Sequence, residues 1–164
     1  MDKNNFVTLD DLTASDIRNV TPPGLMLSIR EKQPSVLILD WEGQKYGLKL
    51  DGDDPFAFFP ISAKTPHDGL FVSNVEILVD FNSRGNGRGR NEHGGVLVLE
   101  KDQLYVIGRP VGEDWLNGRE VPLWPKIDGG SDSAKVAFGS WAIGVKMGDD
   151  YRILWSYEFE PNSD

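Results

Sequence analysis

Three arginines lie close together in the segment Arg84-Gly85-Asn86-Gly87-Arg88-Gly89-Arg90, which contains no acidic residue. Each of Arg84, Arg88 and Arg90 offers a guanidinium fork that matches the oxygens of phosphate or carboxylate. The glycines between them leave backbone N–H groups open to an anion. The segment therefore predicts a loop that binds an anion, an acidic partner or a nucleic-acid backbone. A charged hairpin tip without a ligand is the alternative. The glycine spacing matches neither a Walker loop nor a dinucleotide fingerprint.

Each of the two histidines lies beside a carboxylate, in His67-Asp68 and in Glu92-His93. Imidazole and carboxylate groups ligate metals, and as a pair they can also exchange a proton with a substrate. Both histidines precede expected strands, and the starts of two antiparallel neighbours lie roughly 15–35 Å apart at ~3.3 Å per residue. We therefore expect no shared metal site and no cofactor. Glu92 and His93 are the candidates for an acid–base pair, although a binding protein is favoured over an enzyme.

Two tryptophans fall in an irregular part of the chain. Trp115 and Trp124 lie between residues 109 and 133, where repeated prolines and glycines argue against regular elements. Exposed tryptophan is a frequent anchor of protein interfaces and also stacks on sugars. We therefore predict that Trp115 and Trp124 contact a protein partner or a glycan.

The C-terminal run alternates in the manner of a strand. Its large apolar positions would share one face: Tyr151, Ile153, Trp155, Tyr157 and Phe159. We interpret this face as part of the core. A surface that stacks sugars is the alternative.

Charge and composition exclude several classes of protein. The 164 residues carry 26 acidic and 17 basic side chains, a net charge of −9. Such a surface repels nucleic acid and anionic lipid and suits a basic protein partner.

The absence of cysteine excludes disulfides and thiol catalysis. No apolar run approaches the ~18 residues of a membrane span, and the polar start predicts a cytoplasmic protein. Secretion after removal of a signal is the alternative.

The elements that must position these residues are mostly strands. A helix is expected over residues 8–20, where Thr8 would cap it and Asp10 and Asp11 would lie in its first turn. From residue 24 onward the pattern indicates about eight or nine strands, with a turn at residues 42–44 between two of them. The longest is expected over 70–81, and a hairpin over 96–100 and 103–108. The segment from Asn82 to Gly95 is expected to be a mobile loop.

These elements predict a mainly β fold. We expect an antiparallel β-sandwich or barrel with a short N-terminal helix, because strands do not alternate regularly with helices. One domain is predicted over residues 1–164, made of a helical segment 1–23 and a β core 24–160.

The preferred function is a soluble acidic accessory protein that acts through its loops on a protein partner, for example an inhibitor or an immunity-like protein. The alternatives are a carbohydrate-binding module, a hydrolase that uses Glu92 and His93, and a structural component of a virion or secretion system.

Overall fold

A computed structural model of the chain describes residues 12–30, 33–65, 68–85, 94–100, 103–123 and 135–159. These residues are mainly β structure, as predicted, and form two sheets. The strands are β1 (Leu12–Asp16), β2 (Gly24–Ser28), β3 (Val36–Trp41), β4 (Gln44–Lys49), β5 (Ala57–Pro60), β6 (Asp68–Val72), β7 (Val75–Val79), β8 (Leu97–Glu100), β9 (Gln103–Pro110), β10 (Arg119–Pro122), β11 (Lys135–Phe138), β12 (Ser140–Met147) and β13 (Asp150–Glu158).

Helical structure in the described ranges is confined to single turns of three residues. These are η3 (Ile17–Asn19), η4 (Phe81–Ser83) and η5 (Trp115–Asn117). None of them has the length or the apolar character that a membrane crossing requires.

The larger sheet has the order β1-β6-β2-β3-β4-β5-β9-β8-β11, with β10 also paired to β9. Its neighbours are antiparallel, as expected, except that β5 and β9 are parallel. Because the order ends at β1 and β11, the sheet does not close on itself within the described residues. The barrel that the sequence left open as an alternative is therefore not found.

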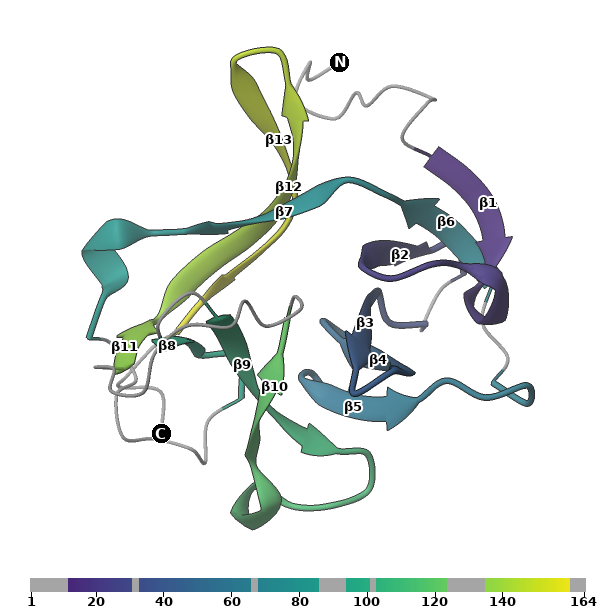
Figure 1. Cartoon of the computed structure of the whole chain (residues 1–164), viewed down its shortest axis with the longest axis horizontal. Helices are drawn as coiled ribbons and strands as arrows, with labels where there is room; N and C mark the ends of the chain where they lie inside the picture. Colours follow the sequence, from purple (N-terminus) through teal and green to yellow (C-terminus); the bar gives the residue numbers. More distant parts are fainter. Residues whose placement is uncertain are drawn as a thin grey trace.

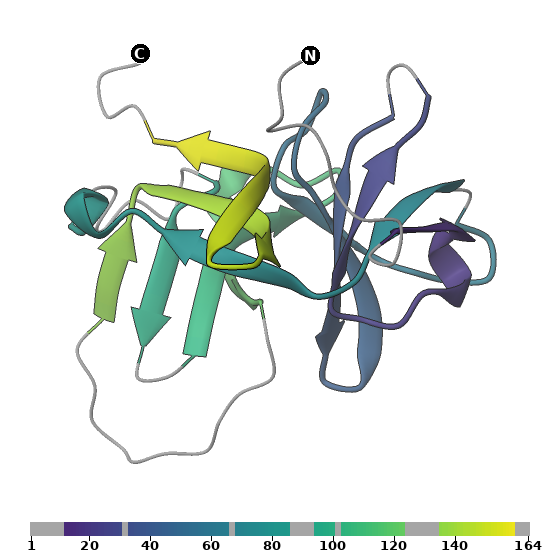
Figure 2. The ribbon, with the colours of Figure 1, turned by 90° about the horizontal axis from the view of Figure 1, so that it is seen from above.

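The smaller sheet has the order β13-β12-β7 and packs one face on the larger sheet (Figures 1 and 2). The main core cluster draws on both sheets and includes Leu25, Leu97 and Ile143. Trp141 is buried in the same cluster and donates its indole N–H to the carbonyl of Gly95 at 2.6 Å. The inner face of the smaller sheet is thereby fixed, and only its outer face is open.

The predicted N-terminal helix is not found. Residues 12–16 instead form β1, which pairs antiparallel with β6, and the following helical turn has only three residues. Asp16 caps that turn by accepting from the backbone N–H of Arg18. The helical pattern was weak, and pairing along the edge of β6 satisfies the same backbone groups while Leu12 packs on the core. The expected start at Thr8 lies outside the described residues.

The long strand predicted over 70–81 is two strands in different sheets. β6 pairs with β1 and β2, whereas β7 pairs with β12. The break comes at Asn74, which has a positive φ of 58°, a conformation that asparagine tolerates better than most residues. Figure 1 shows the chain running from β6 into β7 and so joining the two groups of strands.

The predicted turn at residues 42–44 and the predicted hairpin are both confirmed. β3 and β4 are joined by Glu42 and Gly43, both at positive φ, as a tight two-residue turn requires. β8 and β9 pair antiparallel from Leu97 opposite Val106 to Glu100 opposite Gln103.

Candidate functional site

The outer face of the smaller sheet is an open surface that the strand register brings together. Ala142 of β12 lies directly opposite Leu78 of β7 and Ser156 of β13, so these three side chains form one row across the sheet. In the next row Ser140 lies opposite Glu158 and accepts a hydrogen bond on its carbonyl from the N–H of Asp80. We call these six residues the outer groove: Leu78, Asp80, Ser140, Ala142, Ser156 and Glu158.

A β-bulge decides which side chains of β13 reach this face. Trp155 pairs with Ile143 but Ile153 pairs with Gly144, so Leu154 is the extra residue. An extra residue reverses the inside–outside alternation beyond it. As a result Trp155 and Tyr157 face the core, whereas Ile153 is 49% exposed and Tyr151 is 41% exposed. The prediction that all five apolar positions of the run share one face was therefore wrong for Tyr151 and Ile153.

The outer groove is a shallow depression of about 350 Å³. The small side chains of Ser140, Ala142 and Ser156 form its floor and leave space above the sheet. Leu78 provides an apolar wall on the β7 side. The depression therefore has room for a side chain of a second molecule to lie across the sheet.

Two carboxylates line the outer groove on either side of Ser140. Asp80 comes from the end of β7 and Glu158 from the end of β13. Asp80 accepts a hydrogen bond from the N–H of Asn82, which fixes its position at the start of η4. Within the described part of the chain neither carboxylate forms an ion pair, so both charges are available to a cation.

An exposed aromatic–arginine pair stands beside the groove. Phe81 follows Asp80 and is 66% exposed. The guanidinium carbon of Arg84 lies 4.0 Å from the centroid of the Phe81 ring, and its Nη1 donates to the Phe81 carbonyl at 3.1 Å. Arg84 itself is held against Phe138 of β11 by an antiparallel bridge. The pair is thus a preformed surface feature of the kind that anchors protein interfaces.

Two tyrosines of β13 have perturbed acidity for different reasons. On the outer face, a hydrogen bond to Glu76 is the main cause that raises the pKa of Tyr151. On the inner face, burial raises the pKa of Tyr157, whose hydroxyl donates to the Gly94 carbonyl at 3.0 Å. Both side chains are therefore neutral donors at physiological pH.

Two of the predicted site residues, Arg84 and Trp115, lie within the described residues, and they belong to different parts of the surface. Arg84 lies beside the outer groove, as just described. Trp115 lies in η5, half-buried, with the guanidinium carbon of Arg109 5.0 Å from its ring centroid. Its role as a partner contact stays a prediction. The remaining candidates lie outside the described residues: Arg88, Arg90, Glu92, His93 and Trp124.

No group of three or more His, Asp or Glu side chains in the described ranges is arranged to hold a metal ion. His67 lies outside those ranges, so the expected separation of the two histidines is not measured. The acidic turn residues Asp51 and Asp53 are exposed, and the Asp51 carboxylate accepts from the N–H of Ser35 as an ordinary turn side chain does.

Sequence reasoning did not single out the outer groove. Asp80 is one of 26 acidic residues, and nothing in the sequence gives a reason to prefer it. Its proximity to Glu158 depends on β7 and β13 both pairing with β12. The usable signal was the small size of Ser140, Ala142 and Ser156, which leaves space on a sheet face.

The chain was compared with known proteins at three levels. Residues 14–164 match a family model whose description reads "Uncharacterised protein y4lG". No curated protein matches the chain. No solved structure matches it either. The family description names no activity, so a function has to be inferred from the geometry above.

Proposed function

The chain belongs to the y4lG family of uncharacterised proteins, and we propose that it is an acidic accessory protein that binds a basic segment of a protein partner. The observation that carries the proposal is the outer groove. It combines an apolar wall and a floor of small side chains with two carboxylates that form no ion pair in the described part of the chain. The net charge of −9 favours the same class of partner.

A lysine or arginine side chain fits these features. Its aliphatic stem would lie over Ala142 and against Leu78, and its charged head would reach Asp80 and Glu158. Long basic side chains bury their stems on apolar surface in this way while the head remains near water. Each exposed ion pair contributes only ~0–1 kcal/mol, so several contacts along the segment are needed for useful affinity.

Phe81 and Arg84 complete the proposed surface. The exposed ring supplies apolar contact area at the end of the groove. Arg84 places a positive charge beside that ring, which disfavours a basic group there and so sets the register of the partner segment. This keeps the anchoring role expected for Arg84, now directed to backbone carbonyls or an acidic side chain of the partner.

The other functions weighed from the sequence gain no specific support. Of the tryptophans considered for sugar stacking, Trp155 packs on the core, Trp115 is half-buried and Trp124 lies outside the described residues. The hydrolase hypothesis depends on Glu92 and His93, which lie outside the described residues. The cytoplasmic location also stays a prediction.

The proposal is tested by titrating a fluorescent penta-lysine peptide against the protein and following its anisotropy. We expect saturable binding that weakens as salt is added. The double variant Asp80→Asn with Glu158→Gln is expected to bind about tenfold more weakly, as for two exposed ion pairs of up to ~1 kcal/mol each.

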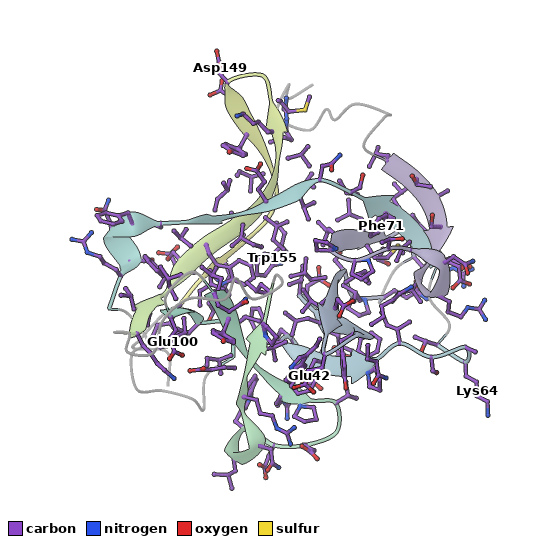
Figure 3. All side chains as sticks on the ribbon, viewed as in Figure 1. Glu42, Lys64, Phe71, Glu100, Asp149 and Trp155 are labelled. Carbon is purple, nitrogen blue, oxygen red and sulfur yellow. The ribbon has the colours of Figure 1, made fainter. Side chains whose placement is uncertain are left out.

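The matched control removes two carboxylates elsewhere on the same sheet. Asp149→Asn with Asp150→Asn changes the net charge by the same amount at the exposed β12–β13 turn (Figure 3). Binding should change by less than about twofold. Equal weakening by the two double variants would mean general attraction to an acidic surface and would refute the groove as the site.

A further inference from the structure

A second depression lies on the larger sheet, whereas the outer groove lies on the smaller one. It has a volume of about 440 Å³ and is lined by η3, β4 and the segment after β5. The lining residues are Arg18, Asn19, Lys45, Ile61, Ser62 and Ala63. We call it the basic cleft, because two cations and, among the described residues, no carboxylate line it on a protein of net charge −9.

The two cations are held in place by the fold. Arg18 forms a two-pronged contact with Asp16, from Nε at 2.8 Å and from Nη2 at 2.5 Å. Its Nη1 donates to the carbonyl of Ala63 at 2.9 Å, and Lys45 donates to the carbonyl of Arg18 at 3.0 Å. These contacts connect all three walls of the cleft, so little ordering of the cations remains to be done when a ligand binds.

Donors remain after those contacts are counted. A guanidinium has five N–H groups and an ammonium has three. Arg18 uses three of its N–H groups in the contacts above, and Lys45 uses one. Within the described residues the backbone N–H of Ala63 has no acceptor, and the Ser62 hydroxyl lies in the same wall. The cleft therefore presents several N–H and O–H donors to one space.

Lys45 supplies most of the positive charge that the basic cleft offers to a ligand. Asp16 balances Arg18, and Asp68 also lies near enough to act on it electrostatically. The hydrogen bond to Asp16 raises the pKa of Arg18, which stays charged. Asp40 lies opposite Lys45 in the β3–β4 register, but Lys45 forms no ion pair in the described ranges. An anion would therefore be held by the ammonium and oriented by the remaining donors.

We propose that the basic cleft binds a small organic anion. Its carboxylate or phosphate group would contact Lys45 and the free N–H groups of Arg18, and its apolar part would lie on Ile61. A cleft of this volume is larger than a bare oxyanion and falls in the range of about 300–1,000 Å³ typical of small-molecule sites. This site is separate from the outer groove in position and opposite to it in charge. The proposal for one site can therefore be refuted without affecting the proposal for the other.

The test is a titration followed by the backbone amide signals of the intact protein in NMR. The probes are inorganic phosphate, phenyl phosphate and benzoate. We expect saturable shifts confined to residues 17–19, 45 and 61–63, and tighter binding of at least one ring-bearing probe than of inorganic phosphate. The comparison of phenyl phosphate with benzoate tells which anionic group is preferred.

Three variants locate the binding. Lys45→Gln should weaken it about tenfold, the usual effect of losing a hydrogen bond to a charged group. Lys64→Gln removes the same charge from a neighbouring exposed lysine, which Figure 3 shows pointing away from the ribbon, and should change affinity less than about twofold. Ala63→Glu leaves both cations in place, adds a negative charge to the wall and should abolish binding. Absence of saturable shifts, or equal effects of Lys45→Gln and Lys64→Gln, would overturn the proposal.

Discussion

Gly95 occupies a position that no other residue fits. Its φ is +93°, and a Cβ there would collide with the Phe56 ring and lie 2.8 Å from Cζ of Tyr157. Its N–H donates to the Ile107 carbonyl at 2.9 Å, and its own carbonyl accepts from Trp141. The end of the glycine-rich segment is therefore part of the packing between the sheets. The mobility expected for Asn82 to Gly95 stays a prediction for its middle, which lies outside the described residues.

Gly95→Ala tests this role directly. We expect a loss of more than ~2 kcal/mol in the free energy of unfolding, because strain at positive φ adds to a steric collision. Gly43→Ala is the control, since Gly43 also has a positive φ of 81° but no atom within 4 Å of the place that a Cβ would take. Its cost should be near ~1 kcal/mol in the same urea titration. Similar losses in the two variants would contradict the packing role of Gly95.

Tyr157 should make the free energy of unfolding decrease as the pH rises into the alkaline range. Burial raises its pKa in the folded protein, so the unfolded chain ionises first as pH rises past about 10. The contribution of Tyr157 is complete below that pH and is lost above it. Tyr157→Phe should cost about 1 kcal/mol near neutral pH, through loss of the bond to Gly94. Its difference from the wild type should shrink above pH 10, and a difference that stays constant would refute this account.

At the scale of elements, the bulge in β13 divides the strand into a part whose large side chains face the core and a part whose large side chains face outward. Residues on the C-terminal side of Leu154 contribute Trp155 and Tyr157 to the core. Residues on its N-terminal side contribute Tyr151 and Ile153 to the outer face. Figure 3 shows Trp155 in the middle of the molecule, where its ring centroid lies 4.7 Å from that of Trp141.

Trp155→Ala and Ile153→Ala compare the two sides of the bulge. Trp155→Ala should cost about 3 kcal/mol, in the range for truncating a large packed side chain. Ile153→Ala should cost less than about 1 kcal/mol, because that side chain is 49% exposed. Thermal or urea unfolding measures both. An unchanged melting temperature for Trp155→Ala would contradict the inward orientation of that part of β13.

At the scale of the whole molecule, the parallel contact between β5 and β9 joins the first strands to the later ones. Asp54, just before β5, forms an ion pair with Arg109 of β9, and both side chains are only 22% exposed. Arg109 also donates to the Glu113 carbonyl and packs over Trp115. One guanidinium thus ties together three segments at the junction.

Asp54→Asn should therefore weaken the whole fold. We expect a loss of about 1–2 kcal/mol, because a partly buried guanidinium keeps its charge but loses its carboxylate partner. Asp53→Asn removes the same charge from an exposed neighbour and should stay within about 0.5 kcal/mol of the wild type. Chemical denaturation followed by tryptophan fluorescence compares them. Equal stability of the two variants would show that the junction does not depend on this pair.

Much of the local structure follows from the order of residues. Continuous apolar residues specify β3, whose first four residues are buried, and the turn residues Glu42-Gly43 join β3 to β4. Of the residues in and around the outer groove, only Arg84, which lies beside it, was singled out from the sequence. Asp80 and Glu158 could not be predicted, because local pattern carries no information on which distant strands become neighbours.

The sequence by itself determined that the chain forms strands, where its hairpins turn and that its surface is acidic, because these depend on side-chain alternation, turn residues and composition. Only the tertiary structure decided that β6 and β7 join different sheets, that β1 is a strand, and that a bulge turns Ile153 and Tyr151 outward. The first two depend on hydrogen bonds between distant segments. The third depends on the register of β13 against β12, where a one-residue offset reverses the face of every side chain beyond it.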